Sequence, residues 1–274
     1  MGTRWLEHAD GLAWEESELL HQAGLCHGVA GRNGGVSQAP YDSLNLALHV
    51  GDSIQAVLEN RRRLCTHIGA SLNQLTTAQQ VHTDHVVAVG KAEIGRGAGS
   101  YADAFAHTDA LMTNVPGAML FLCIADCVPV ILFDPVQKAC AVVHDGWRGT
   151  AARLAAKTVF AMESVYGSRP GDILAYVGPS ISRSHFAVSE STADAFRQLG
   201  KNYAACVYTT DAGQIQVDLW QANRQLLVDA GVQAEHIDVT TACAYEEADR
   251  FYSYRRDHSI TGRMGAFAML TPGR

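Results

Sequence analysis

Residues 118–144, AMLFLCIADCVPVILFDPVQKACAVVH, decide the fold. They contain three apolar runs, at 118–124, 128–133 and 139–144, each of the length of a β-strand and separated from the next by a short segment with turn-forming residues. Both alternating faces of these runs are apolar, which is typical of strands covered on two sides. The stretch therefore predicts a sheet that is buried between layers.

Further strands are predicted on either side of this stretch. Helical patterns do not alternate regularly with them, which favours an α+β fold over a doubly wound sheet. The additional candidates are VVAV from residue 86, ILAYVG from 173, QIQVDL from 214, HIDVTT from 236, FYSY from 251 and MGAFAML from 264.

Three amphipathic helices are also predicted. The first begins at Asp52 as its N-cap, and its apolar seam carries one charged residue, Arg61, on the inward face. The second begins with Thr150 as N-cap and ends before Gly167. The third begins at Asp218, and we expect the last two helices to pack on a sheet.

The composition excludes several classes of protein. The chain has 274 residues, 47% of them hydrophobic, and a formal net charge of −7, as in a globular protein that does not attract nucleic acid. Its longest apolar stretches, 115–125 and 127–133, are too short to span a membrane. Without a repeat, a linker or a signal-like N-terminus, we expect one domain over residues 1–274 in the cytoplasm. Seven cysteines, an odd number, argue against a disulfide framework.

Three residues of metal-ligand or nucleophile type lie at strand ends or turns: His82, Cys127 and His144. They are too far apart in sequence for a zinc finger, but two imidazoles and a thiolate match a catalytic zinc centre whose fourth position is left for water. Taken singly, a residue of this kind is more often structural than a ligand. Cys123 and His85 are alternatives at this point, because they lie four and three residues from Cys127 and His82.

Two aspartates near these residues, Asp109 and Asp126, could act as acid or base groups, or could cap turns. A glycine-rich segment, 27–52, could approach an anion closely, although it matches no phosphate-loop motif and a turn-rich hairpin is the simpler interpretation. Asn45, Arg61 and Arg148 are the candidates for binding phosphate or sugar. An inward arginine such as Arg61 can also simply pair with a buried carboxylate.

Nine blocks of sequence occur in an order that resembles the polyphenol oxidase (laccase-domain) family, whose members are also called peptidoglycan editing factors and multifunctional purine nucleoside enzymes. The resemblance extends from residue 27 to 270. The blocks are HGVAGRNGGVS followed by PYDSLNLALHVGD, then ENRRRL, QVH, DALMT, ADCVPV, VHDGWRGT, VGPSIS, DLWQAN, and FYSYRRD followed by TGRMGAFAML.

The resemblance implies a four-layer α/β/β/α sandwich similar to the catalytic domain of cytotoxic necrotizing factor. It implies a zinc ion held by His82, Cys127 and His144, and substrates that are purine nucleosides and phosphate. The implied reactions are phosphorolysis of adenosine, inosine, guanosine and methylthioadenosine, and hydrolytic deamination of adenosine, with Arg61 and Asn45 at the substrate end of the pocket. A role in editing peptidoglycan precursors is also implied.

The sequence departs from the family pattern at Asp145, where alanine is usual, and at Ala244, where threonine is usual. Asp145 could orient a metal ligand or change the charge of the pocket, and Asp126 or Asp145 could carry a proton during deamination. One alternative function is a metal-free hydrolase with Cys127 as nucleophile and His144 as base. Copper-dependent phenol oxidation fits less well, because the paired His-x-His motifs of a multicopper site are missing. A non-catalytic binding protein is the remaining alternative.

Overall fold

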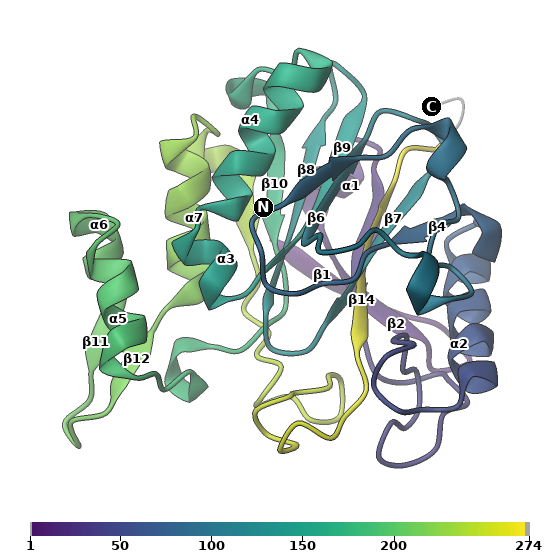
Figure 1. The fold of residues 1–274 in the computed structure, drawn as a ribbon, viewed down its shortest axis with the longest axis horizontal. Helices are drawn as coiled ribbons and strands as arrows, with labels where there is room; N and C mark the ends of the chain where they lie inside the picture. Colours follow the sequence, from purple (N-terminus) through teal and green to yellow (C-terminus); the bar gives the residue numbers. More distant parts are fainter. Residues whose placement is uncertain (1, 272–274) are drawn as a thin grey trace.

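Two six-stranded sheets lie face to face in the body of the protein (Figure 1). The computed structural model describes residues 2–271. Sheet 1 consists, in spatial order, of β1 (Thr3–Glu7), β2 (Ala13–Ser17), β3 (Cys26–Ala30), β14 (Met264–Met269), β7 (Met119–Ile124) and β4 (Leu75–Thr77). Sheet 2 consists of β13 (Ile237–Val239), β10 (Leu174–Val177), β8 (Val128–Asp134), β9 (Ala139–Asp145), β6 (Ala110–Thr113) and β5 (Val86–Ala88).

Alternate residues of the central strands point into different apolar cores. In β7, Leu120 and Leu122 face the core between the two sheets, whereas Met119 and Phe121 face the outer side of sheet 1. The strands of sheet 2 alternate in the same way between the inner core and the outer one. Because each strand is covered on both sides, its sequence is apolar at consecutive positions.

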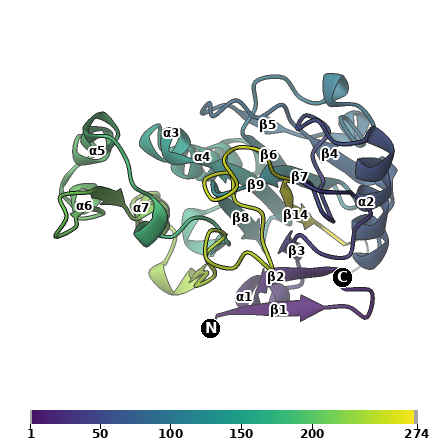
Figure 2. The ribbon, with the colours of Figure 1, turned by 90° about the horizontal axis from the view of Figure 1, so that it is seen from below.

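Helices cover the outer faces of the two sheets (Figure 1). Helix α2 (Ile54–His67) packs on sheet 1, while α4 (Leu154–Tyr166) and α7 (Leu219–Asp229) pack on sheet 2. Figure 2 shows a lobe that stands to one side of this body. The lobe contains α5 (Glu190–Arg197), α6 (Lys201–Ala204), β11 (Val207–Thr209) and β12 (Ile215–Val217); the remaining helices are α1 (Glu18–Gln22) and α3 (Trp147–Ala151).

The structure confirms the α+β class and most of the predicted strands, with one correction. Residues 251–254, FYSY, form no strand. Phe251 and Tyr252 are fully buried in the core that also lies between the sheets, so their apolar character reflects packing and not sheet pairing. Six strands were not predicted: β1, β2, β3, β4, β6 and β11.

The helix predictions need two corrections at their N-termini. Helix α2 is capped by Ser53, whose hydroxyl accepts from the N–H of Ala56, and not by Asp52. Thr150 caps no helix, because it lies inside α3 and its hydroxyl donates to the carbonyl of Gly146 one turn earlier. The caps expected at Gly167 and Asp218 and the inward position of Arg61 are confirmed.

The cysteines and the lengths of the helices bear on two expectations from the sequence. All seven cysteines are free, in agreement with the expectation that the chain has no disulfide framework. Within residues 2–271, none of the helices combines the length and the apolar character that crossing a bilayer requires.

His27 is a buried neutral histidine on β3. Its Nε2 accepts from the backbone N–H of Ser17 at 3.0 Å, and its Nδ1 donates to the carbonyl of Leu25 at 3.0 Å. A proton on Nε2 would point at the Ser17 N–H and remove this bond. Burial lowers the pKa of His27 to about 4, so the imidazole stays neutral in the folded protein at pH values where the unfolded chain takes up a proton.

This difference predicts acid destabilisation that depends on His27. Its contribution is complete above the unfolded pKa of about 6.5 and is lost as the pH falls towards the folded pKa of about 4. Between pH 7 and 4.5 we expect it to lower the free energy of unfolding by about 2 kcal/mol. Urea unfolding at several pH values gives the free energy of unfolding of wild type and of His27→Gln, and the difference between the two should become smaller as the pH falls. Changing the exposed His258 to Asn is the control. A difference between wild type and His27→Gln that does not vary with pH would contradict the prediction.

Candidate metal centre and its pocket

His82, Cys127 and His144 meet in space despite their distance in sequence. One donor atom from each lies within 4.8 Å of the others. Sγ of Cys127 is 3.7 Å from Nε2 of His82, and the centroids of the two imidazole rings are 5.0 Å apart. The family resemblance implied Cys127 and His82 as ligands in place of Cys123 and His85. This geometry agrees with it, since the described residues form no other such group.

The hairpin of β8 and β9 explains why Cys127 and His144 are neighbours. In the antiparallel register, Val128 pairs with Asp145 and Pro129 pairs with His144. Cys127 directly precedes β8, so it lies at the end of the hairpin where β9 finishes with His144 and Asp145. This proximity follows from strand pairing and needs no contribution from the side chains.

Asp109 connects the other histidine to this hairpin. Its carboxylate is fully buried and accepts from the backbone N–H groups of Val81, His82 and Thr83 at 2.8–3.1 Å. The same carboxylate accepts from Nδ1 of His144 at 2.8 Å. It therefore holds the loop that carries His82 and fixes the tautomer of His144. Nε2 of His144 is left as the ring atom that can coordinate a metal.

Gln80 gives the His82 loop a second attachment. Its amide donates to the carbonyl of Cys123 and accepts from the N–H of the same residue, both at 2.8 Å. The side chain thus pairs with the end of β7 as another strand would. Two different side chains, Asp109 and Gln80, consequently keep the loop at the sheet edge.

The electrostatics of the cluster favour a thiolate. Burial by itself raises the pKa of the Cys127 thiol, but His144 and His82 more than offset this effect and bring the pKa to about 6. The thiolate and Asp109 in turn raise the pKa of His144 above its usual range, against the effect of burial. One sulfur and two nitrogen donors, with a carboxylate behind one imidazole, fit a metal of the zinc type.

A cavity of about 430 Å³ opens on this cluster. Its polar side chains include His49, Gln80, Arg148, Arg255 and Arg263. Its aromatic side chains are Trp147, Phe186 and Tyr254. The cavity can therefore accept a ligand with both an anionic and a flat apolar part.

Asp126 and Arg148 are predicted site residues that line this cavity. Oδ2 of Asp126 accepts from the N–H of Arg255 at 2.6 Å, whereas Oδ1 is buried and has no partner among the described residues. Burial raises the pKa of Asp126. The guanidinium of Arg148 lies 4.3 Å from the Trp147 ring, and the side chain makes no hydrogen bond or ion pair with the described residues 2–271.

Asn45 and Arg61 do not line the cavity, which corrects the expected position of both residues. The guanidinium of Arg61 is buried beneath Phe121, where it donates to the carbonyls of Leu46, Gly97 and Ala98.

Asn45 is also fully buried. Its Nδ2 donates to Asp52, and its Oδ1 accepts from the N–H groups of Ala47 and Arg263. The polar groups of both residues are therefore used to hold loops together, and not to reach a ligand.

The two departures from the family pattern lie away from the cavity. Asp145 alternates with His144 along β9, so it faces the helices, and its Oδ2 accepts from the N–H of Ala155 at the start of α4. Burial raises the pKa of Asp145 to about 7. Ala244 is buried in the core between the sheets. The expectation that Asp145 orients a metal ligand is wrong in this geometry.

Nine cavity residues were not predicted, and five of them are polar residues in segments without regular secondary structure: His49, Gln80, Tyr254, Arg255 and Arg263. These five residues all lie inside blocks that carry the family resemblance or next to one, so their positions could have been found from that resemblance. Nothing in their spacing distinguished them from structural residues, because their segments have no regular secondary structure.

The chain matches the family model described as multi-copper polyphenol oxidoreductase laccase over residues 26–271. Purine nucleoside phosphorylase YlmD of Bacillus subtilis is 39% identical over 240 residues, which cover 88% of this chain and 86% of that protein. Purine nucleoside phosphorylase YfiH of Escherichia coli is 36% identical, over 87% of this chain and 91% of that protein. The crystal structure of YlmD from Geobacillus stearothermophilus superposes with a TM-score of 0.91 at 34% identity, covering 97% and 98% of the two chains.

The hydrogen bonds of Asp109 predict the effect of its conversion to the amide. Asparagine cannot accept from three backbone N–H groups and an imidazole at once, so Asp109→Asn should weaken zinc binding about 10- to 100-fold. Competition with a chromophoric chelator measures this affinity. Asp134→Asn is a matched control, because Asp134 is also buried and accepts from two backbone N–H groups, in the β8–β9 turn. Equal zinc affinity in Asp109→Asn and wild type would contradict the role of Asp109.

Proposed function

Because the chain belongs to the multi-copper polyphenol oxidoreductase laccase family, we propose that it is a zinc-dependent purine nucleoside phosphorylase. One observation carries this proposal: the cavity combines three arginines and three aromatic side chains beside the His–Cys–His cluster. A nucleoside presents a flat base that stacks on aromatic rings, and its co-substrate phosphate is an anion that arginine binds well. The cavity volume of about 430 Å³ is typical of sites for small molecules.

The donor set supports zinc more than copper. His82, Cys127 and His144 would hold the metal through two nitrogens and one sulfur, the donor types of catalytic zinc sites, beside the cavity. A copper site for electron transfer with two histidines and a cysteine usually has an axial methionine, and none lines the cavity within residues 2–271. Zinc, when bound, supplies Lewis acidity next to the substrate.

In phosphorolysis an oxygen of phosphate forms a bond to the anomeric carbon of ribose while the bond to the purine nitrogen breaks. The products are the free base and ribose 1-phosphate. Arg148 and Arg263 are our candidates for holding phosphate, in place of Arg61 and Asn45. Such positioning of an anion beside the developing positive charge of the sugar lowers the barrier by orientation and electrostatics. Tyr254 is the candidate for stacking on the base.

We propose hydrolytic deamination of adenosine as a second activity of the same site. The observation that favours it is Oδ1 of Asp126, a buried carboxylate oxygen without a partner among the described residues, on a side chain that lines the cavity. From this position Asp126 can take a proton from water and deliver it to the departing ammonia.

We also propose the finer architecture that the family resemblance implies. The order α2, sheet 1, sheet 2, then α4 with α7, supports a four-layer α/β/β/α sandwich like that of the cytotoxic necrotizing factor catalytic domain. A role in editing peptidoglycan precursors has less support, because no feature of the cavity favours such a substrate over a nucleoside.

Removal of the metal tests the proposed function. The purified protein should convert inosine and phosphate to hypoxanthine and ribose 1-phosphate, lose this activity after treatment with a chelator, and recover it when zinc is added. Liquid chromatography of the free base and elemental analysis of bound metal are the measurements. Activity that persists in the metal-free protein but is abolished by alkylation of Cys127 would instead support the metal-free cysteine hydrolase.

Arg148 provides a more specific test of phosphate binding. Arg148→Ala removes a guanidinium that makes no hydrogen bond within the part of the chain that the structure describes, so the fold should be unaffected. We expect the KM for phosphate to rise about 10- to 100-fold, as for loss of a charge-assisted hydrogen bond, with adenosine deamination changed less than about twofold. Arg62→Ala, an exposed arginine of α2 outside the cavity, is the control. Equal losses in both reactions would argue against a phosphate role.

A further inference from the structure

Residues 251–263 carry three side chains of the cavity, Tyr254, Arg255 and Arg263, yet they form neither helix nor strand. We call this stretch the wall segment. Without a ladder of backbone hydrogen bonds, its conformation depends on contacts with other parts of the chain. The substrate-binding geometry therefore depends on whatever holds the wall segment.

Part of the glycine-rich segment, residues 31–46, supplies many of these contacts, on both sides of the wall segment. Just before it, the N–H of Arg32 donates to the carbonyl of Arg250 at 2.9 Å, and the amide of Asn33 donates to the carbonyl of Asp249 at 2.7 Å. At its far end, Arg263 pairs through its backbone with Oδ1 of Asn45 and with the N–H of Leu46. Residues 31–46, which the sequence offered as an anion-binding loop, thus hold the wall segment in place, and we call them the cradle.

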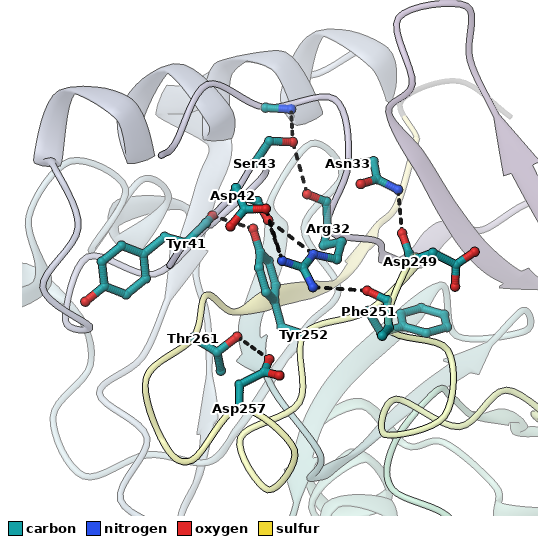
Figure 3. A network of polar contacts seen from close by, with 12 residues as sticks. Arg32, Asn33, Tyr41, Asp42, Ser43, Asp249, Phe251, Tyr252, Asp257 and Thr261 are labelled. Carbon is teal, nitrogen blue, oxygen red and sulfur yellow. Dashed lines mark hydrogen bonds and ion pairs between the residues drawn. The ribbon is translucent and has the colours of Figure 1, made fainter. Parts of the chain in front are cut away.

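Figure 3 shows that the Arg32 guanidinium lies at the middle of this cradle. Nε and Nη2 both donate to the carbonyl of Asp42, at 3.1 and 2.9 Å, and Nη1 donates to the carbonyl of Ala248 at 3.0 Å. The guanidinium also lies 4.7 Å from the centre of the Tyr252 ring. One side chain thereby connects three points of the chain: the cradle, the residue before Asp249 and the start of the wall segment.

Tyr252 transmits this contact along the wall segment. Its ring is fully buried, and its hydroxyl donates to the carbonyl of Tyr41 at 2.6 Å. The backbone of Gly262 lies so close to the ring that an added Cβ would be 2.6 Å from it. Tyr252 is two residues before Tyr254, and Gly262 directly precedes Arg263. The position of one ring consequently influences two side chains of the cavity.

We propose that Arg32 is a positioning residue for the substrate-binding wall of the cavity, acting through Tyr252 on Tyr254 and Arg263. This inference rests on the proposed function for its kinetic consequence but not for its structural one. Arginine is required because a planar guanidinium can donate to carbonyls of two segments while its face lies on an aromatic ring. A lysine ammonium cannot do both.

Steady-state kinetics of Arg32→Ala and Arg32→Lys test the proposal. We expect Arg32→Ala to raise the KM values for inosine and for phosphate about tenfold, with kcat changed less than about twofold and with zinc content equal to wild type. The KM values of Arg32→Lys should lie between those of wild type and Arg32→Ala. Arg96→Ala is a matched control, because Arg96 also lies on an aromatic ring, 4.1 Å from Phe105, and donates to a carbonyl, but outside the cavity. A change in kcat alone, or loss of zinc from Arg32→Ala, would overturn the proposal.

Hydrogen exchange measured by mass spectrometry gives a second test that does not depend on activity. Amides of residues 251–263 should exchange faster in Arg32→Ala than in wild type, while those of β8 and β9 stay unchanged. Unchanged exchange in the wall segment, or faster exchange throughout the protein, would overturn the positioning role. If the wild-type protein does not phosphorolyse nucleosides, the proposed function fails and the exchange result alone decides the role of Arg32.

Discussion

The buried carboxylate of Asp109 is the interaction on which the candidate metal centre depends. It lies immediately before β6 and accepts hydrogen bonds from a loop on one side and from His144 on the other. His82 has a φ of +62°, an unusual conformation for a residue with a side chain, and the three backbone bonds to Asp109 hold it there. Burial raises the pKa of Asp109, but the His144 bond and the backbone N–H groups outweigh it and keep this carboxyl ionised.

The site lies where the chain passes from one sheet to the other. Strand β7 belongs to sheet 1 and β8 to sheet 2, and only residues 125–127 connect them. Asp126 has a φ of +76° in this short connection, and its carboxylate bonds the wall segment through Arg255. A sharp crossing between two packed sheets therefore exposes Cys127 at the sheet edge and brings Asp126 beside it. The apolar cores on both sides keep the crossing rigid.

Arginines serve two distinct purposes around the cavity. Arg61 and Arg32 donate to backbone carbonyls and connect segments that have no regular secondary structure, whereas Arg148 leaves its guanidinium to the cavity. Burial lowers the pKa of Arg61, but three carbonyl acceptors compensate the loss of water around its charge. The helical periodicity that predicted an inward Arg61 was correct about its direction. It could not show that the partners would be carbonyls and not an anion.

The sequence by itself was sufficient for the features that depend on neighbouring residues. The apolar runs from 118 to 144 predicted β7, β8 and β9, and Asp218 predicted the start of α7, because periodicity and capping are local properties. It missed β2, whose Glu15 reads as a surface residue but is buried against Tyr176 and Thr240, hydrogen-bond partners 161 and 225 residues away.

Tertiary structure alone decided which residues meet at the cavity. From the residues by themselves, Cys123 and Cys127 were equal candidates, and so were His82 and His85. The crossing between the sheets and the hydrogen bonds of Asp109 determine which of them converge. The role of the glycine-rich segment as a cradle also appears only in the folded chain, since its partners lie more than 200 residues further along the sequence. Sheet pairing and contacts between distant loops depend on how separate elements pack, and local hydrophobic periodicity carries no information about that packing.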